Sequence, residues 1–255
     1  MRATLAVLAT IVVSVSAAGT ADGRVAGAEK TKPLRMKEHC VRKSDHARVV
    51  RFKAPDGARL LGVTLGKGTV GVALGHEVGA TFCNWLPFAR TLARQGYRVL
   101  AFDFRDAGSS ATVRGTRAEA LDLDYAGAAA VLRARGATRV VVGGASLGAT
   151  AALVAATESV VGASAVFSLS AAATWSTRLD ADAAAAKLAV PVLYLAAEDD
   201  TDFASDASKL YAETAEADKG LLLLPGASHG TFLLRGSPGP QARKAVLDFL
   251  AAHTG

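Results

Sequence analysis

Residues 140–148 read Val140-Val141-Val142-Gly143-Gly144-Ala145-Ser146-Leu147-Gly148, and this stretch decides how the rest of the sequence is interpreted. The valine run predicts a buried strand, and the apolar, alanine-rich residues after it predict a helix. Between them lies the pattern G-x-S-x-G, which places a serine at a sharp strand-to-helix turn. Glycines flank such a turn because side chains there would clash. We therefore interpret Ser146 as a candidate nucleophile and the Leu147 amide as an oxyanion donor.

The same pattern occurs a second time, at Gly226-Ala227-Ser228-His229-Gly230, so the pattern alone decides nothing. The second copy follows a proline and no helix begins directly after it. An alternative for the first copy is a glycine-rich turn that binds a nucleotide. It lacks the lysine of a P-loop and the spacing of G-x-G-x-x-G, and it follows a late strand. The context therefore favours Ser146.

Outward from this turn, the chain alternates strand-like and helix-like segments. An opening hairpin followed by strand–helix units predicts one α/β domain with a mostly parallel, doubly wound sheet of about eight strands. About twenty residues separate the sixth strand from Pro191, so we expect no large cap domain. The expected strands are 48–52, 60–65, 69–74, 98–102, 139–143, 165–169, 191–195 and 220–224, and the expected helices are 85–94, 117–135, 147–157, 180–188, 203–216 and 240–253.

A serine hydroxyl needs a base, and histidine is the usual one near neutral pH. His229 is the one histidine that follows a late strand, in a loop before the last helix; the others are His39, His46, His76 and His253. A carboxylate should orient the imidazole. The strand at 191–195 is followed by Glu198-Asp199-Asp200-Thr201-Asp202, and the pattern does not choose among these acids.

The order of serine, acid and histidine along the chain resembles the α/β-hydrolase superfamily, in its small, cap-less esterase-like and dienelactone-hydrolase-like forms. The stretch Asp103-Phe104-Arg105-Asp106-Ala107-Gly108-Ser109-Ser110 is similar to the superfamily pattern D-x-R-G-x-G-x-S, with Asp106 in place of a glycine. The resemblance implies an α/β-hydrolase fold over nearly the whole chain from residue 48. It also selects Asp200 as the triad acid, with Asp199 in reserve.

The resemblance further implies an oxyanion-binding loop after the third strand, where the family commonly has His-Gly. This chain has Gly75-His76-Glu77-Val78-Gly79, so Glu77 replaces the glycine. The amide of Glu77 or of Val78 would complete the oxyanion hole together with that of Leu147, and a carboxylate at this place would disfavour anionic substrates. Such a site requires no cofactor and no metal.

Composition fits one exported domain. The chain has 255 residues, 51% of them hydrophobic, and a net charge of +6. Residues 1–18 carry Arg2, an apolar run and small residues, which predicts a signal peptide and a secreted protein. Residues 19–47 form a basic arm, and residues 48–255 the catalytic domain. Residues 24–53 hold ten Lys/Arg and three Asp/Glu, so the body is close to neutral.

The basic arm could make weak contact with an anionic surface. We expect no nucleic-acid partner, because no basic face or basic–aromatic pattern is visible along the body. In an exported chain the pair Cys40 and Cys83 favours a disulfide over two separate buried thiols. The oligomeric state is left open by the sequence.

The leading hypothesis is a secreted serine hydrolase that cleaves small or surface-presented carboxylic esters through Ser146, His229 and Asp200. An acyltransferase would use the same triad, with an alcohol in place of water. A catalytically inert binding protein with this fold is the third reading, and Glu77 is the one feature that favours it.

Overall fold

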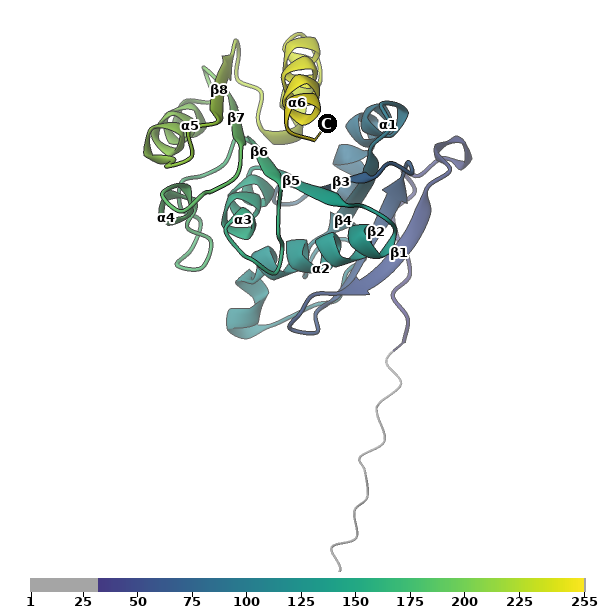
Figure 1. The fold of residues 1–255 in the computed structure, drawn as a ribbon. Helices are drawn as coiled ribbons and strands as arrows, with labels where there is room; N and C mark the ends of the chain where they lie inside the picture. The colour runs from purple at the N-terminus through teal and green to yellow at the C-terminus, as the bar shows by residue number, and fades with distance from the viewer. Residues whose placement is uncertain (1–31, 255) are drawn as a thin grey trace, which may run out of the picture. The chain divides into compact units, whose positions relative to one another are not determined.

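Eight strands form one sheet in the order β1-β2-β4-β3-β5-β6-β7-β8 (Figure 1). The first two strands are antiparallel to their neighbours, and β3 to β8 run parallel. This confirms the predicted single-domain α/β fold with about eight strands. The strands are β1 (Arg48–Lys53), β2 (Arg59–Leu65), β3 (Val70–Gly75), β4 (Arg98–Asp103), β5 (Arg139–Ala145), β6 (Ala165–Leu169), β7 (Val192–Ala197) and β8 (Lys219–Leu224).

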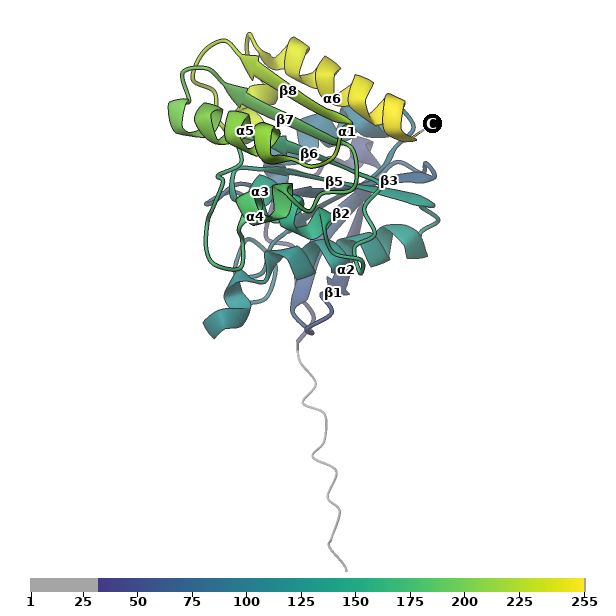
Figure 2. The ribbon, with the colours of Figure 1, turned by 60° about the vertical axis from the view of Figure 1, so that its left-hand side comes forward.

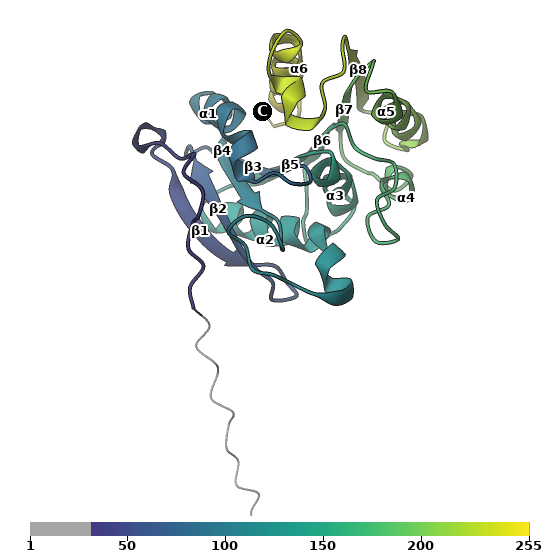
Figure 3. The same ribbon diagram turned by 180° about the vertical axis from the view of Figure 1, so that it is seen from behind.

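Six α-helices cover the two faces of this sheet (Figures 1 and 3). One face packs against α1 and α6, and the other against α2, α3, α4 and α5. Covering both faces explains why the strands are continuous apolar runs. The helices are α1 (Leu86–Arg94), α2 (Leu121–Ala134), α3 (Leu147–Ala156), α4 (Ala181–Ala185), α5 (Thr201–Glu213) and α6 (Gly239–Thr254).

The computed structural model describes residues 32–254, and the compact unit that carries the fold begins at Leu34. The predicted signal peptide (residues 1–18) and the first part of the predicted arm lie outside the described residues. Within residues 32–254, no helix has both the length and the apolar character needed to cross a membrane.

No cap domain is inserted between β6 and β7, as predicted. Only α4 lies between β6 and β7, and α6 lies along the last strands of the sheet (Figure 2). The helix bounds differ most from the prediction at α2, which begins at Leu121 rather than at residue 117 because a 3-10 helix, Gly115–Glu119, precedes it. The carbonyl of Arg117 in that turn accepts a hydrogen bond from the buried Arg105, which holds the segment outside the helix. The helices α4 and α5 each end three residues earlier than predicted.

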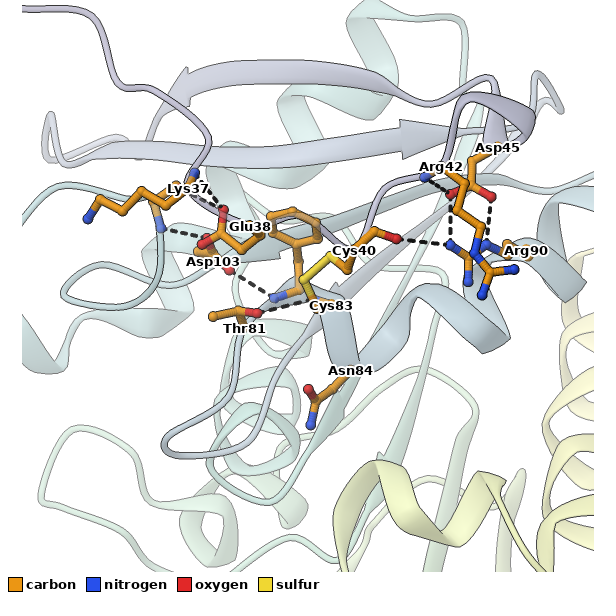
Figure 4. The surroundings of a disulfide bond; sticks show 12 residues. Lys37, Glu38, Cys40, Arg42, Asp45, Thr81, Cys83, Asn84, Arg90 and Asp103 are labelled. Atoms are coloured by element: carbon orange, nitrogen blue, oxygen red, sulfur yellow. Dashed lines mark hydrogen bonds and ion pairs between the residues drawn. A yellow bond between two sulfur atoms is a disulfide. The ribbon is translucent and has the colours of Figure 1, made fainter.

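Several contacts fasten the segment before β1 to the body, among them a disulfide and an ion pair (Figure 4). Cys40 and Cys83 form a disulfide across a sequence separation of 43, as predicted. Arg90 of α1 makes an ion pair with Asp45 at 2.7 Å, and this contact lowers the pKa of Asp45 to about 2. Residues 34–47 therefore belong structurally to the body.

We predict that replacing both cysteines, Cys40→Ser with Cys83→Ser, lowers the free energy of unfolding by roughly 2–4 kcal/mol. The reason is that a disulfide across a loop of this length removes conformational freedom from the unfolded chain. Urea unfolding of the oxidised protein and of the double variant measures the difference. A reducing agent should destabilise the parent protein by the same amount and leave the double variant unchanged, and equal urea midpoints would contradict the prediction.

Asp103, at the end of β4, is a buried carboxyl with an acidic neighbour. Its oxygens accept the amides of Phe82 and Ser109 at 2.8 Å each, and the Ser109 hydroxyl donates to the Glu38 carboxylate. Burial, together with the nearby carboxylate of Glu38 (Figure 4), raises the pKa of Asp103 to about 7. The segment before β1 thus brings a second acid against a carboxyl that already favours its protonated form.

We predict that the contribution of Asp103 to the free energy of unfolding falls as the pH rises from about 4 to about 7. A carboxyl whose pKa is higher in the folded chain binds its proton more tightly when folded, so its contribution is complete below 3.8 and is lost as the pH passes about 7. Asp103→Asn should flatten this slope in urea titrations at several pH values, whereas Asp202→Asn, at an exposed position, should keep it. An unchanged slope in Asp103→Asn would overturn the assignment.

Candidate active site

Ser146 occupies a strained turn between β5 and α3. Its backbone has φ 51° and ψ −120°, a left-handed φ that a side chain seldom adopts, and the residue is buried. The Ser146 amide donates to the Leu169 carbonyl of β6 at 2.8 Å, which fixes the turn to the end of the sheet. The structure therefore has the predicted strand–turn–helix geometry at this serine.

The two glycines of the motif are required by close backbone contacts. A Cβ on Gly144 would lie 2.1 Å from the Gly148 carbonyl oxygen, and one on Gly148 would lie 2.4 Å from the Gly75 carbonyl oxygen of β3. No larger residue fits without moving the backbone. The second copy of the motif differs, because Gly230 there begins a 3-10 helix, Gly230–Leu234.

His229 and Asp200 lie together at the carboxyl ends of β8 and β7. The Nδ1 atom of His229 is 2.7 Å from Oδ2 of Asp200, and the Phe203 ring packs edge-on against the imidazole with centroids 4.3 Å apart. Asp199 is exposed, and its amide donates to the Gly226 carbonyl. Of the neighbouring acids, Asp200 is therefore the one that contacts the histidine.

The histidine loop packs against the serine turn through Gly230. A Cβ on Gly230 would lie 3.5 Å from the Cβ of Ala145, so the residue after His229 lies beside the residue before Ser146. The Gly230 amide donates to the Ser170 hydroxyl at 3.1 Å. Ser170 follows β6 and also has a left-handed φ, of 52°.

Sequence reasoning missed Ser170. One available signal was its place directly after a parallel strand, where functional residues of such sheets gather. Its role is to hold the loop that carries His229, because its hydroxyl accepts a backbone amide from that loop.

Glu77 ties the loop after β3 to the histidine loop. Its Oε1 accepts from the Asn84 side-chain amide at 2.6 Å and from the Thr231 hydroxyl at 2.7 Å. Its Oε2 is buried and has no hydrogen-bond partner among the described residues. The carboxylate is thus turned into the protein as a link between loops. The amides of Glu77, Val78 and Leu147 stay predicted oxyanion donors.

His76 is a structural residue in this fold. Its Nε2 accepts the Phe104 amide at 3.2 Å, so its Nδ1 carries the proton and donates to the Glu77 carbonyl at 2.8 Å. Burial lowers the pKa of His76, which keeps the ring neutral. With both nitrogens engaged, this ring is unsuited to serve as the base for Ser146.

A cavity of about 240 Å³ opens beside Leu147, the residue after the serine. Small-molecule sites commonly measure roughly 300–1,000 Å³, so this cavity suits a short group. In the described part of the chain, no cluster of three or more His, Cys, Asp or Glu side chains could hold a metal ion. The larger apolar residues that line the cavity are Val78, Phe104, Leu121, Leu147, Trp175 and Leu179.

The sheet order, the strained serine and the loops at the strand ends define the α/β-hydrolase class. The chain belongs to the dienelactone hydrolase family, whose model matches residues 62–253. The family match confirms the predicted enzyme class, a carboxylic-ester hydrolase.

Solved structures show the same fold. An esterase of Pyrococcus furiosus has a TM-score of 0.71 and 18% identity, over 83% of this chain and 93% of that chain. A dienelactone hydrolase from Anabaena variabilis has a TM-score of 0.63 and 20% identity, over 81% of this chain and 97% of that chain. No curated protein matches the chain.

Proposed function

We propose that this protein hydrolyses carboxylic esters through Ser146 as nucleophile, His229 as general base and Asp200 as the residue that orients the base. The observation that carries this proposal is the 2.7 Å contact between His229 Nδ1 and Asp200. It commits Nδ1 to the carboxylate and leaves Nε2 for the serine proton. Gly230, beside Ala145, supports a short path between base and nucleophile.

The reaction then proceeds in two halves. The Ser146 hydroxyl attacks the acyl carbon while His229 takes its proton, and the amides of Leu147 and of Glu77 or Val78 stabilise the oxyanion. His229 returns the proton to the leaving alcohol, and an acyl-enzyme remains. Water, deprotonated by His229, attacks the acyl carbon; His229 then gives that proton to the leaving Ser146 oxygen, which releases the acid and restores the free serine. Asp200 stabilises the imidazolium in both halves.

The same proposal includes export from the cytoplasm. The apolar segment within residues 1–18 and the Cys40–Cys83 disulfide both support it, because disulfides persist in oxidising compartments.

We expect a fluorophosphonate probe to label the parent protein and to leave Ser146→Ala unlabelled, as read by intact-protein mass spectrometry. Asp200→Asn should lower kcat for a nitrophenyl ester by about 10³–10⁴-fold, because the imidazole loses the group that holds its tautomer and its cation.

Two matched variants serve as controls for this experiment. Ser228→Ala changes the serine of the second motif copy and should label like the parent, and Asp199→Asn should keep kcat within a few-fold. Labelling that persists in Ser146→Ala, or equal losses in the two aspartate variants, would contradict the assignment of the triad.

The cavity beside Leu147 limits the acyl group to short chains. Trp175 lies at its rim and is 51% exposed, in the loop between β6 and α4 that occupies the place of a cap. The Arg178 guanidinium in that loop makes two hydrogen bonds to Asp122 of α2, at 2.7 and 2.6 Å, which hold the loop in place.

We predict that Trp175→Ala raises the kcat/KM ratio of an octanoyl to a butanoyl ester by about fivefold to tenfold, because removing the indole opens the end of the cavity to further methylenes. A series of nitrophenyl esters of rising acyl length measures this ratio. Phe232→Ala is the control: it is also an exposed aromatic but does not line the cavity. The same change in both variants would contradict an acyl role for this cavity.

A further inference from the structure

A second, larger hollow lies at the opposite edge of the sheet from Ser146. It is a groove of about 1170 Å³, formed by the segment before β1, the turn after β2 and the final turns of α1 and α2. Seven of its fourteen lining residues are Arg or Lys, and one is acidic. The groove thus combines cations of the basic segment 24–53, such as Arg42 and Arg48, with cations of the body.

This groove is separate from the proposed ester site. Arg98, one of its lining residues, begins β4, whereas Ser146 follows the end of β5. Both strands pair with β3 in the parallel sense, so their first and last residues lie at opposite edges of the sheet. Strands of six or seven residues put roughly 20 Å between these edges.

Two of the cations build the walls of the groove. Arg90 makes its ion pair with Asp45, and the disulfide two residues before Arg42 fixes the same segment (Figure 4). The Arg98 guanidinium donates to the backbone carbonyls of Lys67 and Gly68 at 2.9 and 3.0 Å, which holds the turn after β2. The walls of the groove are thus fixed by these contacts and do not depend on the positions of flexible side chains alone.

Other cations of the groove do not hold its walls in place through an ion pair. Arg48, Lys67 and Arg135 are exposed and have no ion-pair partner among residues 32–254. Arg94 and Arg135 lie at helix carboxyl ends, where a positive charge complements the helix dipole. Arg48 and Lys67 lie on a strand and in a turn, so the dipole gives no reason for their charge here.

Gathering like charges in a recess is unfavourable unless an anion occupies it, and a recess lined by one sign of charge concentrates that anion. The volume exceeds that of most small-molecule sites, which suits a length of chain better than a single small anion. Six of the seven cations are arginines, whose guanidinium groups match the geometry of phosphate oxygens.

The lining also limits the kind of polymer. Among the described residues that line the groove there is no Phe, Tyr or Trp. Proteins that bind single-stranded nucleic acids stack bases on such rings, so the groove lacks what bases would contact. A lipid surface is flat and is met by protruding cations, whereas these cations line a hollow. A flexible, base-free phosphate chain fits both features.

We propose that this groove binds a phosphate-bearing polymer without bases, independently of ester hydrolysis at Ser146. The polymer lies along the amino edge of the sheet and pairs its phosphates with Arg48, Lys67 and the neighbouring arginines. The bound polymer would hold the enzyme in place while the carboxyl edge stays open to substrate.

Long-chain inorganic polyphosphate is the probe that tests this, with binding to the full oxidised chain followed by fluorescence anisotropy at several salt concentrations. The double variant Arg48→Glu with Lys67→Glu should weaken binding by at least about tenfold and reduce the salt dependence by about one unit of slope per lost contact. Its hydrolysis of nitrophenyl esters and its thermal unfolding should match the parent.

The matched control is Lys53→Glu with Lys187→Glu, which makes the same change in net charge at exposed lysines outside the groove. It should bind polyphosphate like the parent to within about twofold. Equal weakening in both double variants would show attraction by net charge alone and would overturn the proposal. Absence of polyphosphate binding, or tighter binding of double-stranded DNA or anionic vesicles than of polyphosphate, would overturn it as well.

Discussion

The bend at Ser146 exists because three backbone segments meet with no side chains between them. Gly144 and Gly148 contact each other across the turn, and Gly148 also lies on the Gly75 carbonyl of β3. The buried Tyr125 hydroxyl of α2 lies 2.8 and 2.9 Å from the carbonyls of Gly143 and Gly148, so it closes the turn from the other side. Burial raises the pKa of Tyr125 well above its usual value, which keeps this phenol a donor. The direction of the Ser146 side chain therefore depends on β3, β5 and α2 together.

The loops around this bend are joined to one another as well as to the sheet. Ser170 holds the amide of Gly230, Glu77 holds the hydroxyl of Thr231, and Asp200 holds the ring of His229. Each contact joins a different strand end to the histidine loop. A site held in this way keeps its geometry without a cap domain, because the supporting contacts lie beside the reacting groups. The site stays open as a consequence, and the short loop with Trp175 lies at the rim of the acyl cavity.

The fold and the serine turn could be predicted because each rests on a local signal: apolar runs for buried strands, and glycines where a Cβ has no room. The acid could not be chosen from the residues alone. Asp199 and Asp200 are adjacent, and only the turn before α5 decides which one faces the histidine. Ser170 carries no motif beyond its place directly after a strand, since any hydroxyl at that place could accept one amide. The late start of α2 depends on the buried Arg105, which binds the Arg117 carbonyl from twelve residues away. Contacts of this kind are well defined in the structure but leave no recognisable pattern in the sequence.

The distribution of charge is a further feature that could not be predicted from the sequence. Counted along the chain, positive charge concentrates in residues 24–53 and the remainder is nearly neutral. In the folded chain the positive charge is distributed differently. In a parallel sheet, the first residues of the strands and the last turns of the helices lie at the same edge. Arg98 begins a strand and Arg94 ends a helix, so both arrive at the amino edge beside Arg48. Asp200 of the proposed triad and Glu77 lie at the carboxyl edge. A count of charge by sequence segment averages over the two edges of the sheet. A count by edge separates the cationic groove from the acyl cavity, whose charged lining residues are three acids and one arginine. In an α/β protein, the net charge at each edge of the sheet therefore indicates a binding partner better than the net charge of each sequence segment does.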